Sequence, residues 1–269
     1  MKKLLLCFLF LISFLSFAQN KIKADILSSE DLKILTVEET ITFKNTGDKA
    51  LESVFLYNWL NAFSDKESPL AKRYAEEYVR RFHFASDVER GGTVINSLFT
   101  SSTPSNWKFV KGQPDIMEVE LEKALASGET IDINLNYTLI VPDHKFTGFG
   151  WNQRELNLKH WLIAPAIFEE NQWILYSHKD INDYPLQSLD YDLNLEIPNS
   201  YKVISNFLQT DLESNLTGFQ KLNLSGKNLV GSTLFVKRIN DFEFVQTDHV
   251  NIITNLKDSE LRPEIESLI

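Results

Sequence analysis

Alternation of apolar and polar residues is the feature that most constrains how this chain folds. In three segments, 37–43, 131–141 and 191–197, apolar residues recur along one side and polar residues along the other. Successive side chains of a β-strand point to opposite faces of a sheet, so each segment has one buried and one solvated face. Further short strands are predicted near 117–121, 201–207, 219–224, 233–237 and 242–245. The sequence therefore predicts a mainly β fold built from antiparallel sheets.

Two further patterns place strands in the middle of the chain. Residues 51–60 are apolar on both faces, which is typical of a central strand. Glu169-Glu170-Asn171 separates two apolar runs, and we interpret it as a hairpin turn.

One segment departs from the strand pattern and predicts a helix. Ser68 followed by Pro69 is a helix start, because a capping hydroxyl precedes a residue that fits the first turn. Helical spacing then relates four residues, Ala71, Tyr74, Tyr78 and Phe82. Two acid–base pairs are expected at i,i+4 spacing, Glu76 with Arg80 and Glu77 with Arg81. We therefore predict one inserted amphipathic helix over about 69–84, with its aromatic side chains facing the core.

The N-terminal residues predict export. Two lysines precede an apolar run over 4–14, and Ser16-Phe17-Ala18 fits a small-residue cleavage site. The run is too short to span a bilayer comfortably, so residues 1–18 are expected to be a removable signal peptide rather than an anchor. The single cysteine, Cys7, lies in this segment. The exported chain would therefore be stabilised by its core without disulfides, and cysteine metal sites are excluded.

The net charge of the chain limits the classes of partner that it is expected to bind. The formal net charge is −10 at pH 7. Such an acidic balance argues against nucleic acid and anionic membrane surfaces as partners. We expect a periplasmic or extracellular protein without a stable membrane anchor.

The sequence holds no catalytic or metal-binding signature. Its five histidines are scattered, at His83, His144, His160, His178 and His249. No helix or hairpin therefore supplies a two-histidine grip on a metal ion. There is no H-E-x-x-H, no G-x-S-x-G and no phosphate-binding loop. We assign no catalytic residue and no metal ligand, and expect no intrinsic activity of this chain.

The segment 137–206 is rich in large aromatic residues and holds three of the five tryptophans, Trp151, Trp161 and Trp173. Segments with many apolar rings and few reactive groups usually build a core or a docking face. We expect these tryptophans to fill the core and an inter-domain face, which makes them the candidate docking or substrate-cleft residues. The alternative is an exposed platform that binds a sugar or a peptide.

Several strings together resemble a known family. They are residues 89–92, 114–121, 135–142, 146–151, 160–166, 190–198 and 201–206. In order and spacing they resemble the N-terminal domain of aminopeptidase N-type zinc metallopeptidases (gluzincins). The likeness is closest to the variety in exported proteins of Bacteroidetes, and it covers roughly residues 30–255.

The resemblance implies a saddle-shaped antiparallel β domain that packs against a catalytic domain and helps wall its substrate cleft. The family's zinc ligands, general-base glutamate and G-x-M-E-N motif belong to that next domain, and none matches a position here. Zinc is expected as a cofactor only in the absent catalytic domain, which would be the partner and would bind the peptide substrate. The chain then divides into a signal peptide at 1–18, the β domain at 19–249 and the start of a missing following domain at 250–269.

We therefore expect the non-catalytic N-terminal domain of an exported aminopeptidase-like zinc metallopeptidase, which is either truncated before its catalytic domain or assembled with it from separate pieces. The alternative is a free-standing exported β module that binds glycan or peptide. An autonomous hydrolase with a distributed site is a third reading.

Overall fold

The computed structural model describes residues 20–181, 184–238, 243–246 and 251–254. The signal peptide predicted at 1–18 lies outside this part, as does most of the segment at 250–269 that is predicted to begin a following domain. Within the described residues, no helix is both long and apolar enough to cross a membrane.

The largest element of the fold is an eight-stranded sheet. In spatial order its strands are β16 (Leu208–Leu212), β17 (Phe219–Val230), β14 (Ser188–Pro198), β1 (Lys21–Ser28), β2 (Ile34–Lys44), β8 (Thr130–Ile140), β4 (Gly92–Thr100) and β5 (Thr103–Pro104). Neighbouring strands are antiparallel except β1 and β14, which run parallel. We call it the large sheet.

Two four-stranded sheets and two hairpins complete the β structure. The first sheet has the order β15 (Tyr201–Ser205), β18 (Thr233–Arg238), β10 (Glu155–Lys159) and β9 (Gly150–Trp151). The second has the order β11 (Ala164–Pro165), β3 (Leu51–Tyr57), β7 (Gln113–Leu125) and β6 (Trp107–Val110). The hairpins are β12 (Ile167–Glu169) with β13 (Gln172–Ile174), and β19 (Glu243–Gln246) with β20 (Asn251–Thr254).

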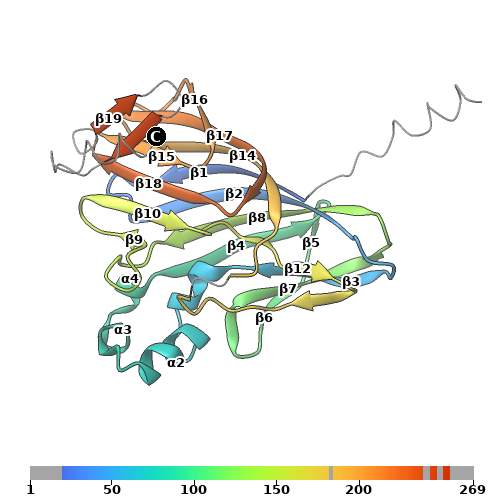
Figure 1. Cartoon of the computed structure of the whole chain (residues 1–269). Coiled ribbons are helices and arrows are strands. Elements are labelled where there is room, and N and C mark those ends of the chain that lie inside the picture. Colours follow the sequence, from blue (N-terminus) through green and yellow to red (C-terminus); the bar gives the residue numbers. More distant parts are fainter. Residues whose placement is uncertain (1–19, 182–183, 239–242, 247–250, 255–269) are drawn as a thin grey trace, which may run out of the picture.

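One hydrophobic core joins the three sheets. Leu135 of the large sheet, Leu156 of β10 and Val119 of β7 all belong to the same buried cluster. Figure 1 shows β3, β6 and β7 together on the lower side of the molecule, with β10, β15 and β18 higher up. The predicted mainly β, antiparallel sandwich-like fold is confirmed.

The segments in which apolar and polar residues alternate form strands, as that alternation predicts. In β2 and β14, buried and more exposed residues alternate along most of the length, so one face of each strand packs on the core. The predicted turn at 169–171 is also found, because β12 and β13 pair antiparallel across Glu170 and Asn171. Both of these residues have positive φ, as a tight two-residue hairpin turn requires.

The segment 51–60 is a strand for only part of its length. β3 is a central strand, between β11 and β7, but it ends at Tyr57. A short 3-10 helix, η1 (Trp59–Phe63), follows and is buried throughout. The strong apolar character of residues 59–63 thus reflects a buried turn of helix, which periodicity alone does not separate from a strand.

The prediction of one continuous helix over 69–84 is wrong, because the chain forms two helices there, α2 (Pro69–Glu76) and α3 (Arg80–Phe84). Ser68 caps α2 as predicted, through its hydroxyl and the Ala71 N–H. The helix stops at Tyr78, which has φ +59°. The Val79 N–H donates to Tyr74 O at 2.8 Å and the Tyr78 N–H to Ala75 O at 3.1 Å, the two bonds of a Schellman motif.

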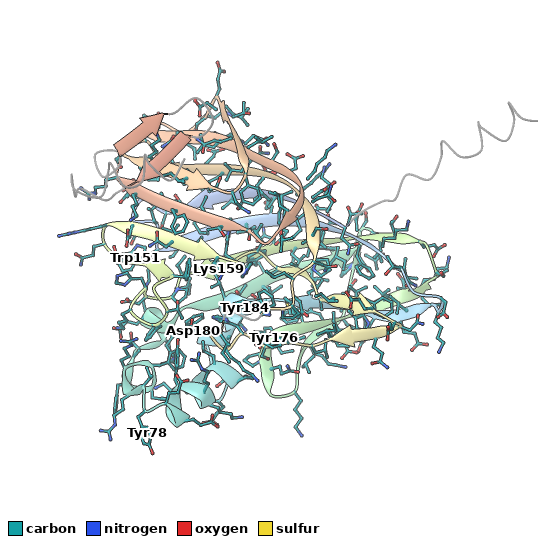
Figure 2. All side chains as sticks on the ribbon, viewed as in Figure 1. Tyr78, Trp151, Lys159, Tyr176, Asp180 and Tyr184 are labelled. Atoms are coloured by element: carbon teal, nitrogen blue, oxygen red, sulfur yellow. The ribbon has the colours of Figure 1, made fainter. Side chains whose placement is uncertain are left out.

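This break changes what the helical residues do. Tyr74 and Phe82 are buried as predicted, whereas the side chain of Tyr78 is 84% exposed (Figure 2). Glu77 pairs with Arg73 of its own helix at 3.0 Å, instead of with Arg81. A third short helix, α4 (Asp87–Arg90), precedes β4 and is capped by Ser86.

Candidate docking site at an irregular strap

An irregular segment connects β13 to β14 and is held in place by side chains from other elements. We call residues 175–181 and 184–187 the strap. The Tyr57 hydroxyl donates to Ile174 O at 2.5 Å, just before the strap, and Trp59 Nε1 donates to Tyr176 O at 2.9 Å. Gln113 Nε2 donates to Leu175 O at 3.1 Å. Side chains of β3, η1 and the start of β7 thus satisfy carbonyl groups at the end of β13 and in the strap.

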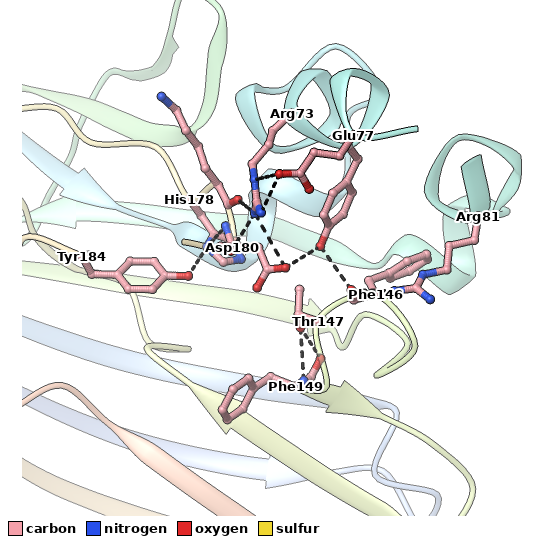
Figure 3. A network of polar contacts seen from close by, with 11 residues as sticks. Arg73, Glu77, Arg81, Phe146, Thr147, Phe149, His178, Asp180 and Tyr184 are labelled. Atoms are coloured by element: carbon pink, nitrogen blue, oxygen red, sulfur yellow. Dashed lines mark hydrogen bonds and ion pairs between the residues drawn. The ribbon is translucent and has the colours of Figure 1, made fainter. Parts of the chain in front are cut away.

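The middle of the strap, residues 178–180, is fixed by polar and charged side chains. Asp115, fully buried, accepts the His178 N–H at 2.6 Å through Oδ2. Arg73 of α2 donates to the backbone carbonyls of Lys179 and Asp180, the latter at 2.6 Å (Figure 3). The Tyr74 hydroxyl donates to Asp180 Oδ2 at 3.1 Å. Because these bonds come from a helix and a strand, the strap has a defined path despite lacking regular structure.

An aromatic cluster joins two strap residues, His178 and Tyr184, to residues outside the strap. Tyr184 stacks on His178, with ring centroids 5.5 Å apart and 24° between the planes, and the Tyr184 hydroxyl lies 2.6 Å from His178 Nδ1. Trp59 and His160 contact the same Tyr184 ring at 5.0 Å and 5.2 Å between centroids. Figure 2 shows Tyr184 between Lys159, Asp180 and Tyr176, in the middle of the molecule.

Burial keeps the two imidazoles of this cluster neutral. It lowers the pKa of His178 to about 3 and that of His160 to about 4. Burial also raises the pKa of the Asp115 carboxyl to about 6. At neutral pH the cluster therefore consists of uncharged aromatic rings, which suits internal packing better than proton transfer.

Two small cavities flank Trp59 and His160, each of about 40 Å³. The first is also lined by Pro185 and Leu186, and the second by Phe149 and Asp180. Such a volume holds one water molecule or the tip of one side chain.

Two apolar side chains of the strap are partly exposed, Leu186 at the first cavity and Ile181 directly after Asp180, which lines the second. Ile181 is 41% exposed and Leu186 is 37% exposed, although the strap itself is firmly held. A fixed segment that displays apolar groups next to unfilled cavities is a surface suited to a protein partner. We call Ile181, Leu186 and the two cavities the docking site.

The structure does not gather the three tryptophans proposed as docking or cleft residues. Trp161 is buried, at 3% exposure, in the connection between β10 and β11. Trp151, in β9, is half-buried, and its Nε1 donates to Asp31 O while Lys33 Nζ lies 4.4 Å from its ring centroid. It lies at the left edge of Figure 2, away from the strap. A docking role for these tryptophans stays a prediction.

Trp173, in β13, is the tryptophan closest in sequence to the strap. Its ring packs against Phe43, Phe55 and Phe168, with centroids 5.4, 5.5 and 4.8 Å away. Trp173 thereby anchors the hairpin β12–β13 to the core. The exposed apolar side chains lie in the strap residues that follow it.

Sequence reasoning missed the residues that build the docking site. Trp59 reaches Tyr176 across 117 positions of sequence, and no local pattern signals that contact. A usable signal was the apolar, non-periodic composition of the strap, with Ile181, Pro185 and Leu186 in a stretch that fits neither strand nor helix. In the described part of the chain, no group of three or more histidine, cysteine, aspartate or glutamate side chains is placed to hold a metal ion.

A scan against models of known protein families and a search of curated proteins found no match. Among solved structures, the chain is similar to a two-domain M1 zinc metallopeptidase bound to L-tryptophan, at 14% identity and a TM-score of 0.49. It is also similar to an M1 zinc metallopeptidase from Deinococcus radiodurans bound to a Tyr-Ser-Ala substrate, at 14% identity and a TM-score of 0.47. Each match covers 87% of this chain and 46% of the other, so the chain spans about half their length. The likeness is distant, and neither activity nor substrate follows from it.

Proposed function

We propose that this chain is the non-catalytic N-terminal β domain of an exported aminopeptidase-like zinc metallopeptidase of the Bacteroidetes type. Its docking site packs on a catalytic domain and helps to wall the substrate cleft of that domain. Zinc and the peptide substrate bind to the catalytic domain, and this chain contributes part of the cleft wall but no catalytic residue. The proposed location is the periplasm or the extracellular space.

The proposal rests on one observation: hydrogen bonds hold the strap in a defined path, and yet the strap exposes apolar side chains. Five side chains, those of Trp59, Arg73, Tyr74, Gln113 and Asp115, bond to residues 175–180, next to exposed Ile181. Beside exposed Leu186, Gln187 Nε2 donates to Pro165 O at 2.8 Å. Holding apolar groups in water is unfavourable by ~25 cal/mol per Å² of apolar surface, and a covering domain removes that cost.

The resemblance to the gluzincin N-terminal domain adds support, because its strings fall on structural landmarks. Residues 135–142 run from β8 into the loop after it, and 146–151 lead into β9. Within this stretch, Gly150 has φ +131°, and a Cβ atom there would lie 2.2 Å from Pro142 O. A glycine at this place is thus required by the backbone.

The test begins with the reading frame that follows codon 269. We expect it to encode H-E-x-x-H on a helix and a later glutamate, the ligand set of the family. The longer protein is then compared with the present chain by amide hydrogen exchange. Slower exchange in the strap of the longer protein, with little change at the edge strand β16, is the expected result.

A substitution checks that the docking site matters for function. Leu186→Glu in the longer protein is expected to lower kcat/KM on aminoacyl amides and to accelerate exchange in the strap, because a carboxylate would be buried at the interface. The matched control is Leu208→Glu in β16, where the leucine is 77% exposed. The proposal fails if no metallopeptidase motif follows, or if both variants behave alike.

A further inference from the structure

The outer face of the large sheet, opposite the core, contains a groove of about 520 Å³. It crosses β14, β1, β2, β8 and β4, which lie side by side in Figure 1. This volume falls within the usual range for small-ligand sites, roughly 300–1,000 Å³. No part of the strap or of the docking site lines the groove.

Strand register arranges the groove in two rows. The first row consists of Asn194, Asp25, Glu38 and Asn136, which are direct neighbours on β14, β1, β2 and β8. The second row lies two residues further along each strand and ends on Phe99 of β4. Neighbouring strands are ~4.8 Å apart, so polar groups recur across the groove at roughly the width of one sugar ring.

Hydrogen bonds between neighbouring strands hold these side chains in position before any ligand binds. Asn194 Nδ2 donates to Asp25 Oδ1 at 2.9 Å, and Asn136 Nδ2 donates to Glu38 Oε1 at 3.4 Å. Each carboxylate has a second oxygen and each amide a second N–H to offer, so the row presents two central acceptors, Asp25 and Glu38, with an amide donor on either side. The half-buried ring of Phe99 adds one apolar wall.

The first row also contains an unfavourable pair. Asp25 and Glu38 are directly opposite each other on antiparallel strands, where like charges destabilise a sheet. Local rules broken without a structural gain usually mark a functional position. A ligand whose hydroxyl groups hydrogen-bond to both carboxylates would reduce this repulsion.

The chemistry of the groove selects among ligand classes. A peptide strand needs a free sheet edge, but the groove lies over interior strands whose backbone groups are already paired. Polyanions are disfavoured by the carboxylates, and an apolar ligand would leave the row of amides and carboxylates without partners. Within the described residues, no carboxylate cluster is placed to hold a metal ion.

We infer that this groove binds carbohydrate, with Asp25, Glu38 and Asn136 hydrogen-bonding vicinal hydroxyls and Phe99 packing against the apolar face of a sugar ring. Planar amides and carboxylates match neighbouring hydroxyls because they present two polar atoms side by side. The site is independent of the docking site, so either can exist without the other.

The test is isothermal titration of the purified chain with cellotriose, maltotriose and N-acetylchitotriose. At least one trisaccharide is expected to bind at millimolar concentration or better. Asp25→Asn and Phe99→Ala are each expected to weaken that binding at least tenfold. Asp132→Asn is the matched control, because Asp132 is exposed on β8, bonds to Thr42 and does not line the groove.

A second readout separates a ligand-binding role from a structural one. Asp25→Asn removes the like-charge contact with Glu38, so it is expected to raise the melting temperature while it weakens sugar binding. The inference is overturned if none of the three sugars binds, if binding is equal in the groove variants and the control, or if Asp25→Asn lowers stability and binding together.

Discussion

At the scale of single residues, Glu39 is the least expected feature of the core. It lies on the inward face of β2, between the positions of Val37 and Ile41, and is 2% exposed. Tyr137 of β8 donates a hydrogen bond to Glu39 Oε2 at 2.7 Å. Burial raises the pKa of the Glu39 carboxyl to about 8, while the Tyr137 hydrogen bond opposes the rise. The carboxyl is therefore mainly protonated at neutral pH.

This pKa predicts a pH dependence of stability. The folded state keeps a proton that the unfolded chain releases above pH 4.5, so the contribution of Glu39 to the free energy of unfolding falls as pH rises from 4.5 to about 8. The slope approaches about 1.4 kcal/mol per pH unit within that window. Glu39→Gln keeps an acceptor for Tyr137 and is expected to remove this slope, giving a more stable protein at pH 8.

Urea unfolding at pH 5, 6, 7 and 8 measures the effect. Glu52→Gln is the control, because Glu52 is an exposed carboxylate on β3 and does not line the groove of the large sheet. Equal slopes for the wild type and Glu39→Gln would contradict the assigned protonation state. The alternation pattern alone places Glu39 on the inward face, so its burial was predictable. Its partner Tyr137 was not, because that contact depends on the register of β2 against β8.

At the scale of elements, the sequence predicts strands better than helices. β8 and β14 were predicted from the alternation over 131–141 and 191–197, and the burial pattern of each strand matches. The helix prediction failed at Tyr78 because helical spacing reports which residues would share a face, not whether the backbone continues. Tyrosine is an uncommon residue in the left-handed conformation that a Schellman motif requires, so the sequence carried no stop signal there.

The strained position of Tyr78 yields a prediction. Tyr78→Gly is expected to raise the free energy of unfolding by about 1 kcal/mol, because glycine adopts φ +59° without the steric cost paid by tyrosine. Thermal unfolding followed by circular dichroism measures the change. Tyr78→Ala is the control, since it removes the same exposed ring but keeps a Cβ atom. A glycine variant no more stable than the alanine variant would show that this backbone carries little strain.

At the scale of the whole molecule, one pairing unites the two halves of the large sheet. β1 pairs antiparallel with β2 on one side and parallel with β14 on the other. Without β1, the sheet divides into β16-β17-β14 and β2-β8-β4-β5. Neither the parallel pairing nor its register was predictable from the sequence, because both depend on contacts between residues as far apart as Asp25 and Asn194, 169 positions along the chain.

Truncation tests the importance of this strand. A chain that begins at Ser29 is expected to lose its cooperative thermal transition. Removal of β1 leaves the facing edges of β2 and β14 unpaired and takes the buried side chains of Ile22, Ala24 and Ile26 out of the core. The control begins at Asn20 and keeps all of β1, so its transition is expected to match that of the full chain. A sharp two-state melt for the shorter chain would show that the two halves fold without β1.

The long separation between β1 and β14 has a consequence for biogenesis. A ribosome releases β1 well before β14 has been synthesised, so during translation β1 can find only β2 as a neighbour. Until β14 arrives, a row of backbone N–H and C=O groups on β1 is a template for strands from other copies of the chain. The lifetime of that half-paired intermediate, rather than the stability of the finished protein, then sets the concentration at which refolding competes with aggregation.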